Sequence, residues 1–191
     1  MSRPSPRTSE YLLKSARPAE EYEIFISSGS DLEDQRDRLT QLANVFNDQA
    51  RDARVAYRLI PRRWEQAVSR RTHGDGNLEF RYDAETAHLV VVLLHRDLRP
   101  GTREELERAM KCSDTQVAVI WMDPPPPTSR KREVLELRTV MNDLREDVRW
   151  ESTGAPGSAE SVDKMVAVLV RTLIHAAHAG STVGVPYNEA R

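Results

Sequence analysis

The sequence predicts an α/β protein with one five-stranded parallel sheet and helices on both faces. Three observations support this fold class. Apolar runs of strand length alternate with amphipathic segments of helix length along most of the chain. Residues 89–94 form an unbroken apolar run, which is typical of a strand buried on both faces of a parallel sheet. The 191 residues show no internal repeat and suit one domain of ordinary size.

The chain divides into a leader, a single domain and a tail. Residues 1–20 are rich in Ser, Pro and Arg and lack periodicity, so we expect a flexible leader. The α/β domain is predicted to span residues 21–180. Residues 181–191 are expected to form a disordered tail.

The first half of the domain is predicted to contain two strands and a long helix. Residues 22–27 form the first strand. Ser30 and Glu33 have the spacing of a capping box, so a helix is predicted from there to about Ala50. The apolar stripe of that helix is Leu32, Leu39, Leu42, Val45 and Phe46. The second strand is predicted at residues 55–60, ended by Pro61, and a polar segment with a short helix at 78–86 follows.

The second half repeats the strand and helix alternation. Strands are predicted at residues 88–95, 116–122 and 148–150, and helices at 102–111, 130–146 and 158–179. Such alternation indicates a parallel sheet, and right-handed crossovers restrict its topology to a few choices. Five strands favour the flavodoxin-like order 2-1-3-4-5, in which ligands bind at the carboxyl ends of strands one and three.

Composition and charge exclude several classes of function. The net charge of −2 gives no reason to expect nucleic acid or an anionic membrane as a partner. No apolar run approaches the roughly 18 residues of a membrane-spanning helix, and no secretory signal is visible. The single cysteine, Cys112, excludes an internal disulfide and fits a cytoplasmic protein. No Cys or His group has the spacing of metal ligands, so we expect no metal site.

Two of the segments at the predicted crevice carry candidate binding residues. Ser27 and Ser28 end the first strand, where small hydroxyl residues and a helix start favour anions, although an ordinary capped turn is the more common explanation of such a segment. Arg62, Arg63 and Trp64 follow the second strand. The Trp packs on the edge of the core or stacks on a flat heterocycle. In the second case the arginines lie near phosphates, because a guanidinium meets two oxygens at once.

The third segment, residues 99–109, follows the buried third strand, and two roles are open for its Glu105. Thr102 and Glu105 have capping-box spacing, and acids are favoured in a first helical turn. Glu105 could instead stand at the mouth of the crevice as a catalytic carboxylate. Cleavage of an N-glycosidic bond builds positive charge at the anomeric carbon, and a fixed carboxylate is the natural counter-charge. Arg99 precedes this helix as a further candidate phosphate neighbour.

These segments together resemble a known family. Residues 23–28, followed by Ser30, Asp31, Leu32 and Arg36, resemble the opening of TIR domains and are more similar still to the TIR-like family DUF4062. Residues 62–65 are similar to the Trp-Glu that follows strand two in some bacterial TIR-like domains.

The third segment resembles a motif that TIR-like domains share with nucleoside deoxyribosyltransferases. Gly101 to Glu107, with Ala109, is similar to the "GT..E.E.A" pattern of both families. In their enzymatic members the acid four residues after the Gly is the catalytic Glu. The resemblance therefore implies that Glu105 is the catalytic carboxylate, with Ser27, Ser28, Arg62, Arg63, Trp64, Arg99 and Thr102 as candidate substrate contacts.

The implied function is cleavage of NAD⁺ at the nicotinamide–ribose bond, with NAD⁺ as substrate and no cofactor. Bacterial relatives often act in defence against phage, are activated by assembly into oligomers or filaments, and work with sensor domains or partner proteins. Two alternatives stay open. One is an N-glycosidase or deoxyribosyltransferase that uses the same Glu105 on nucleosides or nucleotides. The other is a non-catalytic TIR-like module that signals by self-association, since fold alone does not establish activity.

Overall fold

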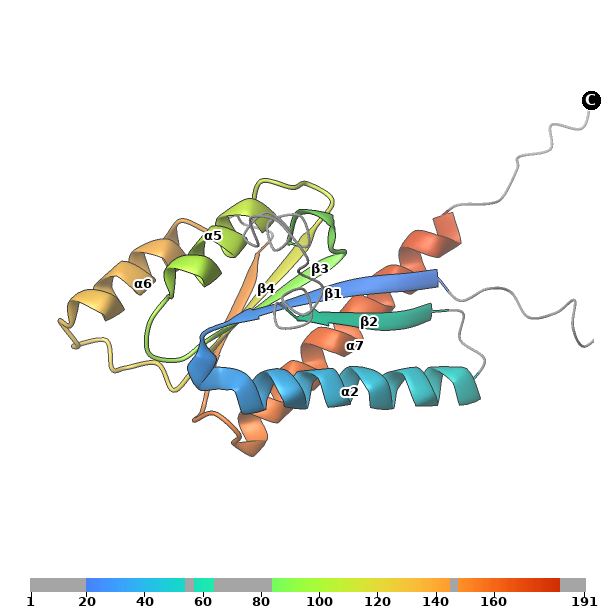
Figure 1. Ribbon diagram of the computed structural model, residues 1–191, viewed down its shortest axis with the longest axis horizontal. Helices are drawn as coiled ribbons and strands as arrows, with labels where there is room; N and C mark the ends of the chain where they lie inside the picture. Colours follow the sequence, from blue (N-terminus) through green and yellow to red (C-terminus); the bar gives the residue numbers. More distant parts are fainter. Residues whose placement is uncertain (1–19, 54–56, 64–83, 145–147, 183–191) are drawn as a thin grey trace, which may run out of the picture.

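A computed structural model of the chain describes residues 20–53, 57–63, 84–144 and 148–182 (Figure 1). The strands are β1 Glu20–Ser28, β2 Tyr57–Arg63, β3 Leu89–Leu94, β4 Gln116–Met122 and β5 Arg149–Thr153. The helices are η1 Ser30–Leu32, α2 Glu33–Asp52, α5 Pro100–Ala109, α6 Arg132–Asn142 and α7 Ala159–Thr182. Residues 1–19 of the expected leader and 183–191 of the expected tail lie outside the described residues, whereas Glu20 belongs to β1 and residues 181–182 belong to α7.

All five strands pair in parallel, in the order β2-β1-β3-β4-β5, which confirms the predicted topology. From β1 the chain crosses to β2 at one edge of the sheet, and it then returns to the other side of β1 to form β3. The carboxyl ends of β1 and β3 therefore meet at the point where the winding direction changes, which is where ligands bind in folds of this kind.

The two faces of the sheet are each covered by a pair of helices. Helices α2 and α7 lie on one face, and α5 and α6 lie on the other (Figure 1). Strand β3 contributes to both cores, because its side chains point alternately to the two faces and all six are buried. This double burial explains why its sequence is an unbroken apolar run.

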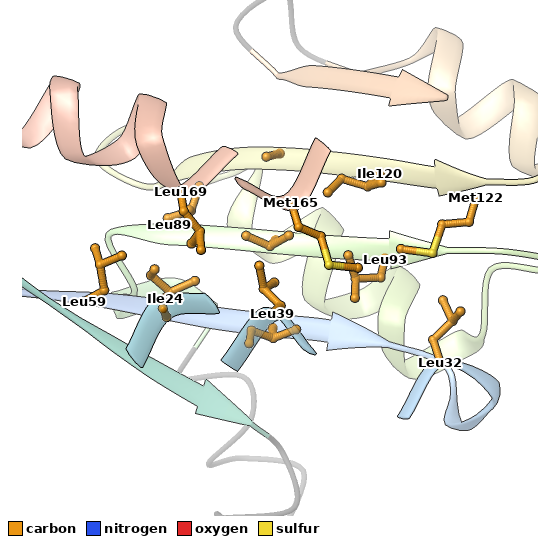
Figure 2. Close-up of a cluster of buried hydrophobic side chains, with 14 residues drawn as sticks. Ile24, Leu32, Leu39, Leu59, Leu89, Leu93, Ile120, Met122, Met165 and Leu169 are labelled. Atoms are coloured by element: carbon orange, nitrogen blue, oxygen red, sulfur yellow. The ribbon is translucent and has the colours of Figure 1, made fainter. Parts of the chain in front are cut away.

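The core under α2 and α7 contains the side chains shown in Figure 2. Leu39 of α2 and Met165 and Leu169 of α7 pack against Ile24 of β1 and Leu89 of β3. Burial of each such side chain contributes roughly 1.5–3 kcal/mol to folding. This core holds the first strand and its following helix in fixed positions.

The predicted stripe of α2 is correct at four positions and wrong at one. Leu32 and Leu39 are buried, and Leu42 and Phe46 pack partly buried on the same core. Val45 is 52% exposed. Residues that follow one another in a helix are about 100° apart, so Val45 lies beside the buried stripe rather than within it.

The second strand extends beyond its predicted end. Pro61 does not end β2 but pairs with Ile24 inside it, and the strand continues through Arg62 and Arg63. Proline is tolerated here because β2 is an edge strand, where one side of the backbone needs no partner strand. Asn47 of α2 covers this edge: its amide donates to the carbonyl of Leu59 at 2.7 Å and accepts from the N–H of Leu59 at 2.8 Å.

Both predicted capping boxes are wrong. Ser30 begins the 3-10 turn η1, and α2 begins only at Glu33, with Leu32 at the capping position. Helix α5 begins at Pro100 with Arg99 at the capping position, so Thr102 lies inside its first turn. In none of these three helices does a side chain form the capping hydrogen bond. The capping-box spacing is present in the sequence, but each helix begins at a different residue from the one predicted.

Candidate functional site

Glu105 lies in the second turn of α5, with its side chain directed to the carboxyl end of β1. The hydroxyl of Ser27, the eighth residue of β1, donates a short hydrogen bond to Oε2 of Glu105. Ser27 is fully buried and Glu105 is partly buried. The first turn of α5 contains no acid, so Glu105 neither caps the helix nor offsets its dipole there. Of the two roles left open for Glu105, the capping role is contradicted.

The surroundings of Glu105 change its acidity. Burial raises the pKa of its carboxyl from an ordinary 4.5 to about 7. The hydrogen bond from Ser27 lowers this pKa, and the nearby Glu104 carboxylate raises it further. Burial dominates because a carboxylate loses much of its hydration when it leaves water. A carboxyl group that titrates near neutrality in a ligand-binding position is typical of functional sites.

Ser28 points to the opposite face of the sheet, where it meets a buried arginine. Arg36 of α2 is 1% exposed, and its Nη1 donates to Oγ of Ser28 at 2.6 Å and to the carbonyl of Gly29 at 2.8 Å. These bonds hold the loop between β1 and η1 against α2. Arg36 was noted in the sequence only as part of the family pattern, and the contact with Ser28 shows its structural purpose.

The arginines predicted as phosphate neighbours are engaged in ion pairs. Arg62 donates to Oε1 of Glu23 at 2.7 Å, and Arg63 donates to Oδ1 of Asp37. Both residues belong to β2 itself and not to a loop after it. Their guanidinium groups are thus held by carboxylates of β1 and α2, an arrangement that the sequence spacing did not reveal.

The other three predicted contact residues lie in different surroundings or outside the described residues. Arg99 forms an ion pair with Asp97, with 3.2 Å between Nε and Oδ2, and its side chain lies beside Gly29. Thr102 is buried at 4% exposure. Trp64 lies outside the described residues, so its predicted stacking role stays a prediction.

The structure adds one pair that sequence reasoning passed over. His95 follows β3 directly, and its Nδ1 lies 3.5 Å from Oδ2 of Asp31 in η1. Their side chains are 17% and 31% exposed. The five histidines of the chain lack any diagnostic spacing, and the partner of His95 is 64 residues away in the sequence. The only available signal was position, because both residues follow the ends of strands one and three.

A hollow elsewhere on the molecule is distinct from this site. A groove of about 870 Å³ lies between α5 and α6 and is lined by Arg103, Glu104, Glu107 and Glu136, but not by Glu105. Within the described ranges, no three or more His, Cys, Asp or Glu side chains are grouped in a way that could hold a metal ion. No described helix has the length and apolar character needed to cross a membrane.

Comparisons with known proteins support the fold and no family. No family model matches the chain, and no curated protein matches it. Flavodoxin 1 from Bacillus cereus is similar in structure, with 12% identity and a TM-score of 0.45 over 82% of this chain and 99% of that one. An oxidoreductase from Corynebacterium diphtheriae has 14% identity and a TM-score of 0.49 over 83% of this chain and 99% of that one.

A third similar structure is much longer than this chain. Rubredoxin oxygen:oxidoreductase from Desulfovibrio gigas has 14% identity and a TM-score of 0.48 over 91% of this chain. The chain spans 39% of the length of that protein. The strand order establishes the flavodoxin-like fold, and the folds of these similar structures agree with it.

These structures correct one prediction. The sequence analysis expected no cofactor, yet the similar structures are a flavodoxin and several oxidoreductases, among them a putative quinone reductase and an azoreductase. Their names contradict the expectation of no cofactor, because a flavodoxin is among them. At this level of similarity they assign no cofactor to this chain.

Proposed function

We propose that the chain is a TIR-like NAD⁺ glycohydrolase that cleaves the bond between nicotinamide and ribose. One observation carries this proposal: Glu105 is a partly buried carboxyl at the switch point of the sheet, with a hydrogen bond from Ser27, a pKa near 7 and no capping role. The resemblance of residues 101–107 to the motif of N-glycoside-cleaving families supports the same conclusion.

The geometry suits a reaction that builds positive charge. When the glycosidic bond breaks, the ribose becomes an oxocarbenium-like centre, which an ionised carboxylate stabilises most strongly in a site of low dielectric. Ser27 holds Oε2 of Glu105, so the carboxyl group is oriented by a rigid strand. The positively charged nicotinamide ring leaves as a neutral molecule, so its departure needs no acid.

The described residues at the carboxyl edge of the sheet fit the phosphate of a flavin poorly. Ser28 and Arg36 provide a hydroxyl and a guanidinium that suit a phosphate, but the guanidinium is bound to the loop itself. The visible absorbance spectrum of the purified full-length protein reports whether it retains a flavin.

The direct test of the proposed function is release of nicotinamide from NAD⁺ by the concentrated full-length protein. Nicotinamide and ADP-ribose are separated by chromatography, with a crowding agent present because we propose that self-assembly activates the protein. We expect nicotinamide release by the wild type. Absence of release at high concentration, with assembly shown by light scattering, would contradict the proposal and favour the signalling module.

Two further substrates distinguish the proposed function from the remaining enzymatic alternative. An N-glycosidase or deoxyribosyltransferase would cleave nucleosides or nucleoside monophosphates faster than NAD⁺, because its site accommodates no second nucleotide. We expect the reverse order of rates. A role in defence against phage, and a sensor partner that triggers assembly, belong to the same proposal and follow only from the family resemblance.

Replacement of Ser27 by Ala is expected to move the pH dependence of the reaction to higher pH. The Ser27 hydroxyl stabilises the ionised form of Glu105, so its loss raises the pKa of the carboxyl further. The activity of Ser27→Ala should thus fall at pH 6 and approach the wild-type value at pH 9, in profiles of kcat/KM against pH. Ser27→Thr keeps the hydroxyl and serves as the control. An unchanged profile in Ser27→Ala, or an equal shift in Ser27→Thr, would disprove this positioning role.

A further inference from the structure

The pair formed by Asp31 and His95 lies at the same carboxyl edge of the sheet as Ser27, which binds Glu105. Asp31 follows β1 by three residues and His95 follows β3 by one, and β1 and β3 are neighbouring strands. Ser27, which holds Glu105, lies four residues before Asp31. Two separate functional groups thus lie at the carboxyl ends of two adjacent strands. One is a carboxyl group with a raised pKa, and the other is a histidine paired with a carboxylate.

The structure fixes both members of the pair. The carbonyl of His95 accepts a hydrogen bond of 3.0 Å from the indole of Trp121, which is buried on β4. Asp31 lies in η1, whose Leu32 N–H donates to the carbonyl of Gly29 at 3.2 Å. These bonds hold the backbone at His95 and the turn that contains Asp31.

Gly29 makes room for this arrangement. A Cβ atom at this position would stand 2.5 Å from Oδ1 of Asp31 and 3.4 Å from Cγ of Arg99. The first contact is too close, so a larger residue at position 29 would displace the Asp31 side chain from its place near His95. Arg99 in turn forms an ion pair with Asp97.

Oδ2 of Asp31 lies at Nδ1 of His95, and this choice of nitrogen matters chemically. A carboxylate on the Nδ1 side of an imidazole orients the ring and leaves Nε2 as the atom that can accept a proton. Among the described residues, no hydrogen bond to Nε2 of His95 is present. The pair therefore has the arrangement of an oriented general base.

We propose that His95 is the general base that activates water in the hydrolysis of NAD⁺, and that Asp31 is its positioning residue. This inference rests on the proposed function. The C1′–N bond breaks and its electron pair passes to the pyridinium nitrogen, which releases neutral nicotinamide. The oxygen of water forms the new bond to C1′, and Nε2 of His95 takes the proton. Loss of that proton to solvent restores the imidazole, and the product is ADP-ribose.

The test separates bond cleavage from the use of water. The full-length protein is incubated with NAD⁺ and isotopically labelled free nicotinamide, and two products are measured by mass spectrometry. Exchange of labelled nicotinamide into NAD⁺ requires Glu105 but no water, whereas ADP-ribose formation requires both. For His95→Gln we expect ADP-ribose formation to fall by roughly 100-fold, the usual size of general-base catalysis, while exchange is retained. Asp31→Asn should show the same change in ratio to a smaller extent.

His88→Gln is the matched control, because His88 lies just before the opposite, amino end of β3, where its Nδ1 accepts from the N–H of Glu23. Its ratio of exchange to hydrolysis should equal that of the wild type. Parallel loss of both reactions in folded His95→Gln, or an unchanged ratio, would overturn the role of His95 and leave the proposed function standing. Absence of both reactions in the wild type would overturn the proposed function and this inference together. Thermal unfolding curves verify that each variant is folded.

Discussion

Replacement of Glu105 by Gln is expected to reduce nicotinamide release from NAD⁺ by at least roughly 100-fold. Gln keeps the size of the side chain and can still accept the hydrogen bond from Ser27, but it cannot supply negative charge to the oxocarbenium-like centre. The loss should appear mainly in kcat, because the interaction strengthens only as charge develops on the ribose. Initial rates at pH 8, where the wild-type carboxyl is ionised, measure the effect.

Glu107→Gln is the matched control for this prediction. Glu107 is exposed on the same helix, two residues from Glu105, so the variant loses the same charge from α5 without altering the switch point. Its kcat and KM should remain close to those of the wild type. Equal activity of folded Glu105→Gln and wild type would show that Glu105 does not stabilise the transition state, and the proposed mechanism would fail.

The same Glu105→Gln variant is expected to be more stable than the wild type at pH 8. The pKa of this carboxyl is about 7 in the folded chain and near 4.5 when it is exposed. Between these values the folded state binds more protons than the unfolded state, so the free energy of unfolding of the wild type falls as pH rises. Above pH 7 the cost is complete and amounts to about 3 kcal/mol. Gln carries no charge to bury and avoids this cost.

Urea unfolding at pH 4.5 and at pH 8 measures the prediction. The difference in unfolding free energy between Glu105→Gln and wild type should be small at pH 4.5 and grow towards pH 8. Glu107→Gln should show no such growth, because its carboxyl is exposed. If Glu105 were a structural residue, its replacement would lower stability at every pH, so a destabilised Glu105→Gln protein at pH 8 would contradict the interpretation.

A gain of stability with a loss of activity is the pattern expected of a functional group. A carboxyl in a partly buried position costs free energy of folding, and proteins keep such groups where activity needs them. The hydrogen bond from Ser27 offsets part of that cost without removing it, since burial remains the largest influence on the pKa.

Much of the fold could be predicted because its signals are local. The apolar run 89–94 identified β3, and its burial on both faces is what the structure shows. Residues 116–122 were predicted as a strand with the correct limits. Other boundaries were wrong where tertiary contacts overrode local signals. Pro61 was taken as a strand end, yet pairing with Ile24 carries β2 past it, because the edge position removes the usual penalty.

The candidate site also combines features set by local signals with features set by tertiary contacts. Its position at the ends of strands one and three follows from the order of strands and helices, which the sequence by itself determined through periodicity and chain connectivity. Only the tertiary structure decided which side chains meet there. Ser27 and Glu105 are 78 residues apart, and His95 and Asp31 have no local pattern that joins them. Such contacts depend on strand register and on the residue at which a helix begins, and a shift of one or two residues would turn Glu105 away from β1. Packing of the whole sheet fixes those details, whereas spacing along the chain does not.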